Sequence, residues 1–237
     1  MGRNNWFEFK QFRVEQEKSA MKVGTDGVLL GAWSPVNGAY RILDIGTGTG
    51  LISLMLAQRS AAMIDAIEID SLACEEARFN FKKSAWSDRL QVIHIDFGKV
   101  DNLFDQSYDL VVSNPPFFVN SLKTANAALA LARHNDSLSF EQLLSGSSRL
   151  LRNTGRLCVI LPFSSYPEFR ETARLAGFYL KKRTLVVPKS GKEPKRILME
   201  FSLEVTYPLE DELTLLDLNG NYTEDYKSLT SPFYPAF

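Results

Sequence analysis

An asparagine, two prolines and two phenylalanines follow an apolar run in the stretch DLVVSNPPFFVN, residues 109–120. The Asn114 side-chain oxygen and the Pro115 carbonyl can accept the two protons of a planar amino group. Such a nitrogen delocalises its lone pair, so two fixed acceptors favour a tetrahedral nitrogen that can attack an electrophile. Pro115 and Pro116 hold the backbone in place, and Phe117 offers a face on which a planar substrate stacks. The stretch predicts group transfer to an amino nitrogen, although taken alone it also fits a proline turn beside core phenylalanines.

A glycine-rich stretch, ILDIGTGTGLISL at 42–54, has the spacing of a ligand-binding loop between a strand and a helix. Gly46, Gly48 and Gly50 let the backbone approach a ligand closely. A dinucleotide fingerprint would need glycine at position 51, which is Leu51. Asp44 stands two residues before the first glycine, where a carboxylate suits a positively charged amino group and disfavours a pyrophosphate.

Acidic residues also end the next two predicted strands. Glu68 lies 22 residues after Gly46 and is placed to accept both hydroxyls of a ribose. Asp96 could accept a hydrogen bond from an adenine amino group, with Phe97 beside the ring. Glu68 alone could be a solvated carboxylate, but an amine, a ribose and an adenine together describe S-adenosyl-L-methionine as the cofactor. Asn114, at the end of the fourth strand, would then lie beside both cofactor and substrate.

The elements that position these residues alternate between strands and helices along the chain. Ser71 is a plausible N-cap for the second helix, and Gly155 is expected to stop the third. Strands are predicted at 41–45, 63–69, 90–95, 108–113, 156–162, 179–188 and 196–205, and helices at 50–60, 71–84, 139–153 and 167–178. Apolar strands alternating with helices predict an α/β fold in which helices cover both faces of a largely parallel sheet. We expect a Rossmann-like, seven-stranded mixed sheet with an antiparallel last strand.

The first 40 residues precede this sheet. Residues 7–16 alternate like a strand, and residues 25–33 resemble a capped short helix. We expect residues 1–40 to form a lid segment packed on the cofactor site, and residues 41–237 to form the catalytic part of a single domain.

The composition of the 237 residues is that of a soluble globular protein, with 45% apolar and 23% charged residues. Apolar runs are too short for a membrane span, and the first residues predict no secretion signal. We therefore expect a cytoplasmic protein with Cys74 and Cys158 reduced. His94 and His134 lack metal-ligand spacing, so no metal is predicted. The sequence does not predict an oligomeric state.

The net charge of −1 hides an uneven distribution of charge. Seven basic residues and one acid lie between Lys181 and Arg196, whereas seven acids and no base lie between Glu204 and Asp225. The basic block could follow a nucleic-acid backbone, or it could be an ordinary solvated surface.

These motifs resemble known families. The strand-end carboxylates and glycine loop resemble the class I methyltransferases, and the NPPF motif resembles the [Asp/Asn/Ser]-Pro-Pro-aromatic signature of amino-methyltransferases. The stretches FRVEQEKSAMKVGTDGVLLGAW, NPPFF, ARHNDSLSFEQLL and YTEDYKSLTSPFY resemble the bacterial tRNA (adenine-N6)-methyltransferases that modify adenosine 37, next to the anticodon of a valine tRNA. This resemblance covers nearly the whole chain. It implies that Thr25 and Asp26 contact the methionine end of the cofactor and that the anticodon loop of tRNA is the partner. Weaker substrate contacts are implied for Arg133, Lys189, Lys192, Lys195 and Arg196.

Other families share some of these motifs. A release-factor glutamine methyltransferase usually has tyrosine at position 117 and a helical N-terminal domain. A DNA adenine methyltransferase usually carries a target-recognition domain, and similar rRNA guanine-N2 enzymes carry a second methyltransferase-like half. Leu51 disfavours an NAD-dependent dehydrogenase, and an intact Asn114–Phe117 motif disfavours a catalytically silent RNA-binding module.

Overall fold

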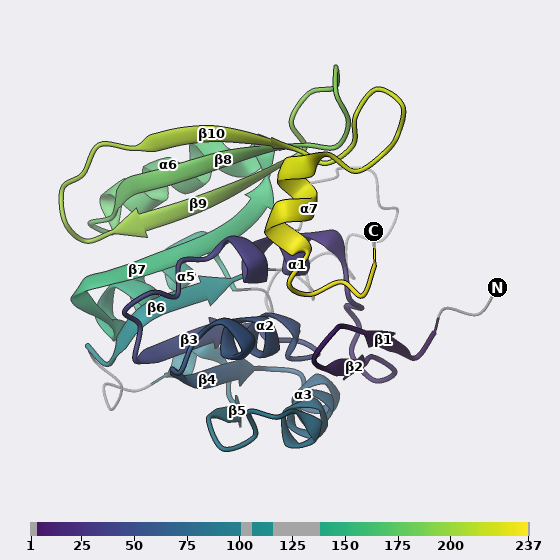
Figure 1. Cartoon of the computed structure of the whole chain (residues 1–237). Helices are drawn as coiled ribbons and strands as arrows, with labels where there is room; N and C mark the ends of the chain where they lie inside the picture. The colour runs from purple at the N-terminus through teal and green to yellow at the C-terminus, as the bar shows by residue number, and fades with distance from the viewer. Residues whose placement is uncertain (1–3, 101–105, 116–137, 237) are drawn as a thin grey trace, which may run out of the picture.

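The computed structural model describes residues 4–100, 106–115 and 138–236 (Figure 1). The strands are β1 (Trp6–Glu8), β2 (Arg13–Glu15), β3 (Arg41–Ile45), β4 (Met63–Glu68), β5 (Leu90–His94), β6 (Tyr108–Ser113), β7 (Leu151–Pro162), β8 (Tyr179–Val187), β9 (Arg196–Ser202) and β10 (Leu209–Thr214). The helices are α1 (Thr25–Trp33), α2 (Leu51–Arg59), α3 (Ser71–Lys83), α5 (Phe140–Leu150), α6 (Tyr166–Leu175) and α7 (Glu224–Thr230), with short 3-10 turns η1 (Phe97–Lys99) and η3 (Phe163–Ser165). None of the described helices is long and apolar enough to cross a membrane.

The central sheet has eight strands in the order β10-β8-β9-β7-β6-β3-β4-β5. Strand β9 runs antiparallel to both of its neighbours, and the other pairs are parallel. The mixed sheet and the antiparallel strand are confirmed, but the predicted number of seven strands was wrong. The additional strand, β10, has the sequence LEDELT and is largely exposed. It escaped prediction because it lacks the apolar alternation by which half-buried strands are recognised.

Helices cover both faces of the sheet, as expected. On one face α1, α2, α3 and α7 pack over strand residues such as Ile42, and on the other α5 and α6 pack over residues such as Leu43 (Figure 1). Neighbouring positions of one strand enter opposite cores because side chains alternate across a strand. The parallel strands all end at one edge of the sheet, and this edge carries the site.

Local sequence signals set the helix boundaries with three corrections, the last of which is that α1 lacks the cap expected for it. The N-cap of α3 is Asp70, whose carboxylate accepts the Ala73 N–H at 2.8 Å, and Ser71 is the first helical residue. Helix α5 begins at a capping box and ends at Leu150, before Gly155, because the chain enters β7 at once. Helix α1 begins after Gly24 without a side-chain cap.

The two ends of the described chain meet beside α2. The hairpin of β1 and β2 is joined to the C-terminal segment by a hydrogen bond from Lys10 N–H to the Phe233 carbonyl at 2.8 Å. Phe9 and Tyr234 stack with ring centroids 5.9 Å apart. The N-terminal hairpin is therefore packed as part of the domain (Figure 1).

Candidate functional site

A cavity of about 330 Å³ opens at the carboxyl edge of the parallel strands. Ligands bind at this edge in open α/β sheets, and the volume is in the range of small-molecule sites. Its walls come from the glycine loop, from the ends of β4, β5 and β6, and from the N-terminal segment. They comprise Ser19, Ala20, Met21, Ile45, Gly46, Gly48, Ile67, Glu68, Ile69, Asp70, Ala73, Ile95, Asp96, Phe97, Ser113, Asn114, Pro115, Leu138 and Gln142.

The glycine loop turns back on the neighbouring strand. The N–H groups of Gly46 and Thr47 both donate to the Ile67 carbonyl, at 2.8 and 3.1 Å. Gly48 has a φ of +56° and lies on the cavity wall, and Gly50 has a φ of +84° and precedes α2. A side chain is disfavoured at such φ values. A Cβ on Gly50 would also lie 2.5 Å from the Phe81 ring, so this position requires glycine for two reasons.

Glu68 is held rigidly at the end of β4. It is 8% exposed, and its carboxylate accepts three backbone N–H groups: Gly48 at 2.8 Å, and Ile69 and Asp70 at 2.9 Å each. Backbone N–H groups stabilise the charged form of a carboxylate. The structure therefore places a fixed acceptor on the cavity wall, joined directly to the glycine loop.

Asp44 lies behind the loop rather than on the cavity wall. It is fully buried, and its Oδ2 accepts the hydroxyls of Thr47 at 2.6 Å and Ser53 at 2.7 Å. Its Oδ1 has no hydrogen-bond partner among the described residues. Burial raises the pKa of Asp44 to about 6, while the hydrogen bonds from Thr47 and Ser53 lower it and the charge of Glu68 raises it further. A buried carboxylate with an unused oxygen is suited to a cationic donor.

Asp96 and Phe97 follow β5, which ends at His94, and both line the cavity. The Asp96 Oδ1 accepts the Gly98 N–H at 2.9 Å and so caps the turn η1. Phe97 is 7% exposed and packs into the core beneath the turn. The structure places these residues together with Gly46, Gly48, Glu68, Asn114 and Pro115 around one cavity.

Asn114 directly follows Ser113, the last residue of β6, and lines the cavity. Ser113 ties that strand end to β3, since its hydroxyl donates to the Ile45 carbonyl at 2.9 Å. The Asn114 Oδ1 is buried and accepts no hydrogen bond from any described residue. An unused buried acceptor costs free energy unless a ligand supplies the donor. Pro116 and Phe117 of the same motif lie outside the described residues.

Some predicted contacts lie away from the cavity. Thr25 and Asp26 form the first turn of α1, and neither lines the cavity. Asp26 instead accepts from Arg196 Nε at 2.7 Å, so a predicted cofactor contact and a predicted tRNA contact pair with each other. Gly50 also lies outside the wall, at the start of α2. Phe118, Arg133 and His134 lie outside the described residues.

Sequence reasoning missed several residues of the wall. Ser19, Ala20 and Met21 form one side, and Gln142 of α5 contributes another polar group. Ser19 and Ala20 carry no motif of their own and stand immediately before the MKVGTDG stretch on which the family resemblance rests, and Met21 is the first residue of that stretch. The only sequence signal at Gln142 is its place as the last residue of the capping box that begins at Ser139.

The comparisons with known proteins agree with this geometry. Residues 22–169 match the family described as the methyltransferase small domain, and the chain belongs to this family of methyltransferases. A Bacteroides fragilis protein named tRNA1(Val) (adenine(37)-N6)-methyltransferase is 45% identical over 97% of both chains. Proteins of the same name from Trichodesmium erythraeum (46%; 97% of this chain and 98% of the relative) and Aeromonas hydrophila (42%; 99% of both) are similarly close.

Solved structures share the fold. A protein from Agrobacterium tumefaciens described as a predicted O-methyltransferase has a TM-score of 0.69 and 20% identity, covering 88% of this chain and 96% of that one. Together with the family match, this fold identifies an S-adenosylmethionine-dependent methyltransferase.

Within the described ranges, His, Cys, Asp and Glu form no group that could hold a metal ion, and both cysteines are free and buried.

Proposed function

We propose that this chain transfers the methyl group of S-adenosylmethionine to the N6 amine of adenosine 37 in a valine tRNA. Relatives of that name match it at 41–46% identity over nearly its full length. The structural observation that carries the chemistry is the buried, unpartnered Oδ1 of Asn114 on the wall of the cavity. A tRNA substrate also implies a cytoplasmic protein.

The acidic residues of the cavity wall suit a cofactor that carries cationic groups. S-adenosylmethionine supplies an electrophilic methyl on a sulfonium, together with a cationic amine, a ribose and an adenine. Glu68 would hold the ribose hydroxyls and Asp96 the adenine amine, with Phe97 beneath the ring. Asp44 does not line the cavity, so its unused Oδ1 would attract the amine from behind the glycine loop. Residues 1–40 would act as the lid of this site and residues 41–237 as the catalytic part. Asp26 would support that lid through its contact with Arg196.

Asn114 and Pro115 would act on the amine that receives the methyl group. The Asn114 oxygen and the Pro115 carbonyl would accept its two protons and so release the nitrogen lone pair for attack. The new N–C bond forms as the methyl leaves sulfur with its bonding electrons remaining there, and the nitrogen then loses one proton to solvent. Positioning and preorganised acceptors supply the rate acceleration. The prediction from the motif stands for two residues outside the described ranges: Phe117 would stack the adenine, and Pro116 would restrict the backbone.

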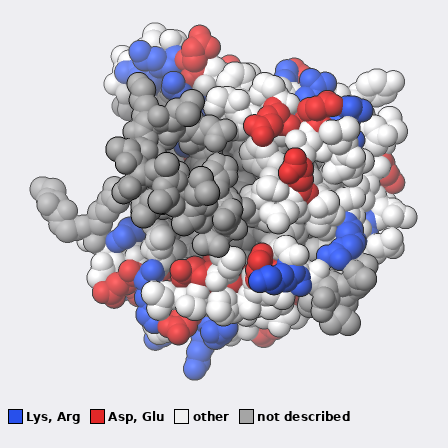
Figure 2. Space-filling view, turned by 180° about the vertical axis from the view of Figure 1, so that it is seen from behind, with Lys and Arg blue, Asp and Glu red and all other residues white. Residues whose placement is uncertain are grey.

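The tRNA would approach over the loop between β8 and β9. Strands β7 and β8 are parallel to β6 through the sheet, so this loop lies at the same edge as Asn114. Figure 1 draws this loop at the upper right, and the 180° turn brings it to the upper left of Figure 2, where Lys and Arg side chains lie beside acidic ones. Lys189, Lys192 and Lys195 form no ion pair within the part of the chain that the structure describes. Unpaired lysines are suited to phosphate contacts.

An aromatic side chain lies beside these lysines. The Phe163 N–H donates to the Lys195 carbonyl at 3.1 Å, and the ring is 37% exposed. It stacks on Tyr166 with an interplanar angle of 9°. Bases of single-stranded loops stack on such aromatic faces, so we propose that Phe163 supports a base of the anticodon loop next to the adenosine that is modified.

The test is methyl transfer from labelled S-adenosylmethionine to total tRNA from cells that lack the gene, followed by nuclease digestion and mass mapping. We expect N6-methyladenosine at position 37 of a valine tRNA with the wild-type protein and none with Asn114→Ala. Label in rRNA or in a release factor, with none in tRNA, would overturn the substrate while keeping the methyltransferase.

A further inference from the structure

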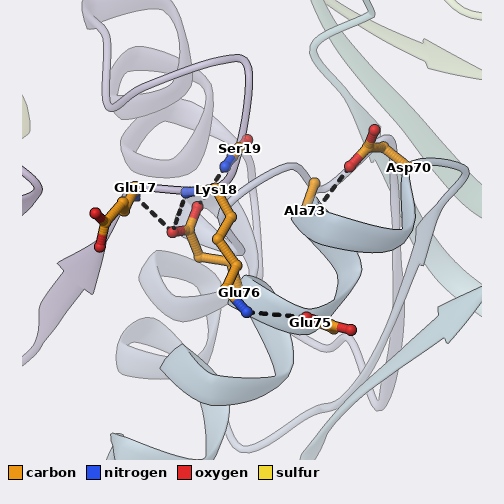
Figure 3. Close-up of polar contacts among 7 residues, drawn as sticks. All are labelled: Glu17, Lys18, Ser19, Asp70, Ala73, Glu75 and Glu76. Atoms are coloured by element: carbon orange, nitrogen blue, oxygen red, sulfur yellow. Dashed lines mark hydrogen bonds and ion pairs between the residues drawn. The ribbon is translucent and has the colours of Figure 1, made fainter.

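The N-terminal wall of the cavity is attached to α3 by a single buried carboxylate. Glu76 is 4% exposed, and its Oε1 accepts the N–H groups of Glu17 at 2.6 Å and Lys18 at 2.8 Å. Its Oε2 accepts the N–H of Ser19 at 2.8 Å. Figure 3 shows the carboxylate pointing from α3 at these three consecutive backbone groups. Charge-assisted hydrogen bonds of this kind are about twice as strong as neutral ones.

A second buried side chain on the same helix extends the attachment. Asn80 is 1% exposed and lies one turn after Glu76. Its Oδ1 accepts the Glu15 N–H at 2.9 Å, and its Nδ2 donates to the carbonyls of Glu15 at 2.9 Å and Thr49 at 2.8 Å. Asn80 therefore joins three segments: α3, the strand β2 and the glycine loop.

The segment held in this way reaches the cavity directly. Ser19 and the two residues after it line the wall, and a Cβ on Gly48 would lie 3.6 Å from the Ser19 hydroxyl. Helix α3 also begins shortly after Glu68, and Asp70, its N-cap, is itself part of the wall. One rigid helix thus fixes the acceptor at the end of β4 and the segment that faces the glycine loop.

We propose that Glu76, assisted by Asn80, is a positioning residue that sets the affinity for S-adenosylmethionine by holding residues 17–21 as a wall of the cofactor cavity. Glu76 does not line the cavity, so its effect acts through the backbone it holds. This inference rests on the assignment of the cavity to the cofactor, and it concerns cofactor binding rather than methyl transfer.

The chain offers a matched control at the preceding position. Glu75 is exposed and pairs with Lys18 Nζ at 2.9 Å, so it contacts the same segment through a solvated side chain (Figure 3). Exposed ion pairs of this kind contribute little to the stability of a fold. Glu76→Gln and Glu75→Gln each remove one negative charge from α3, but only Glu76→Gln turns an amide N–H toward the backbone N–H groups.

The experiment measures S-adenosylmethionine binding by calorimetry and steady-state kinetics against tRNA for the three proteins. We expect Glu76→Gln to raise the cofactor Kd and KM at least about 10-fold, with kcat at saturating cofactor and KM for tRNA within about 3-fold of wild type. Glu75→Gln should stay within about 2-fold in every constant. A fall in kcat with an unchanged cofactor KM, or equal effects of both variants, would overturn the proposal.

A measurement on the wild-type chain covers the case in which Glu76→Gln does not fold. By linkage, a ligand that binds only the closed form of the attached segment lowers the population of the open form, by up to about 100-fold at a ligand concentration of 100 Kd. We expect hydrogen exchange at the N–H groups of residues 17–19 to slow by at least about 10-fold when S-adenosylmethionine is added. Unchanged exchange, with binding confirmed in the same sample, would refute the role of the wall. Absence of binding would instead count against the proposed function, and with it the inference.

Discussion

Arg196 donates through Nε to the Asp26 carboxylate at 2.7 Å, although the two residues lie 170 positions apart in the chain. The pair joins the first turn of α1 to the start of β9. Three more members of the basic block are also paired: Lys181 with Glu200, Lys182 with Asp211 and Arg183 with Glu210. The last two acids belong to β10, so part of the acidic tail neutralises the basic strand beside it. Within the basic block, the charge available to a polyanion is therefore concentrated in the loop between β8 and β9.

The first prediction compares the lysines of the loop between β8 and β9 with Arg196, which is already paired with Asp26. Lys192→Glu with Lys195→Glu should weaken tRNA binding about 10-fold or more at moderate salt. The double variant should also reduce the slope of log affinity against log salt, by roughly 0.7–0.9 for each phosphate that the protein no longer neutralises. Arg196→Gln should have a smaller effect, because its charge is already used by Asp26. Filter binding across a salt series measures both quantities.

Lys82 and Lys83 supply the matched control for this double variant. Both are exposed and end α3, which runs back from the cofactor edge toward the start of β5 at the opposite edge of the sheet. Charge reversal there should leave affinity and salt dependence within about 2-fold of wild type. Equal losses from the two double variants would mean that the loop has no special part in tRNA binding.

Much of the cofactor site could be predicted because it depends on local pattern. Strands β3 and β6 have the predicted bounds, 41–45 and 108–113, since apolar runs of that length between turn signals specify buried strands. Parallel strands end at one edge. Glu68, Asp96 and Asn114 therefore meet there as a consequence of topology.

The remainder depends on contacts between distant residues. Ser19–Met21 reach the cavity because Glu76, 57 positions further on, accepts the Ser19 N–H. Strand β10 is stable as a strand although half of its residues are acidic, because Arg183 and Lys182 lie across from it. Neither relationship leaves a pattern in the local sequence, so neither could be predicted.

The second prediction concerns the glycine loop. Gly50→Ala should lower the free energy of unfolding by about 2–5 kcal/mol, since the new side chain meets both the positive φ and the Phe81 ring. Gly220→Ala isolates the first cause: its φ is +88° and nothing lies within 4 Å of the added Cβ. That control should cost about 1–2 kcal/mol. Denaturant unfolding of both variants measures the difference, and equal losses would rule out the contact with Phe81.

The third prediction concerns the catalytic acceptor. Asn114→Ala should lower kcat on the order of 10²–10³-fold, the loss seen when one preorganised polar partner is removed from a reacting centre. Cofactor Kd should change by less than about 10-fold. Asn114→Asp keeps an oxygen at the same position and should retain more activity than the alanine variant. Single-turnover kinetics at saturating cofactor provide the comparison, and an alanine variant as active as the aspartate variant would refute the acceptor role.

The fourth prediction concerns Asp44 and pH. Its pKa is raised from the ordinary value of 3.8 to about 6, so between these values the folded protein binds the proton more tightly than the unfolded chain. The protonated form therefore stabilises the fold fully below about pH 4, and this contribution is lost as pH rises through about 6. The difference corresponds to a free energy on the order of 3 kcal/mol. Asp44→Asn should remove that part of the pH dependence, so the stability of wild type relative to the variant, measured by denaturant unfolding, should fall between about pH 4 and 6.5.

Cofactor binding provides the second half of the same test. A cationic amine held at the unused Oδ1 favours the ionised carboxylate, so binding near pH 6, where Asp44 is about half protonated, should release up to about half a proton from it. Calorimetry in buffers of different ionisation enthalpy measures this release directly. Asp44→Asn should bind the cofactor more weakly and release no proton from this group. Equal proton release by wild type and Asp44→Asn would show that the amine is held elsewhere, because the variant has no carboxyl group to titrate at that position.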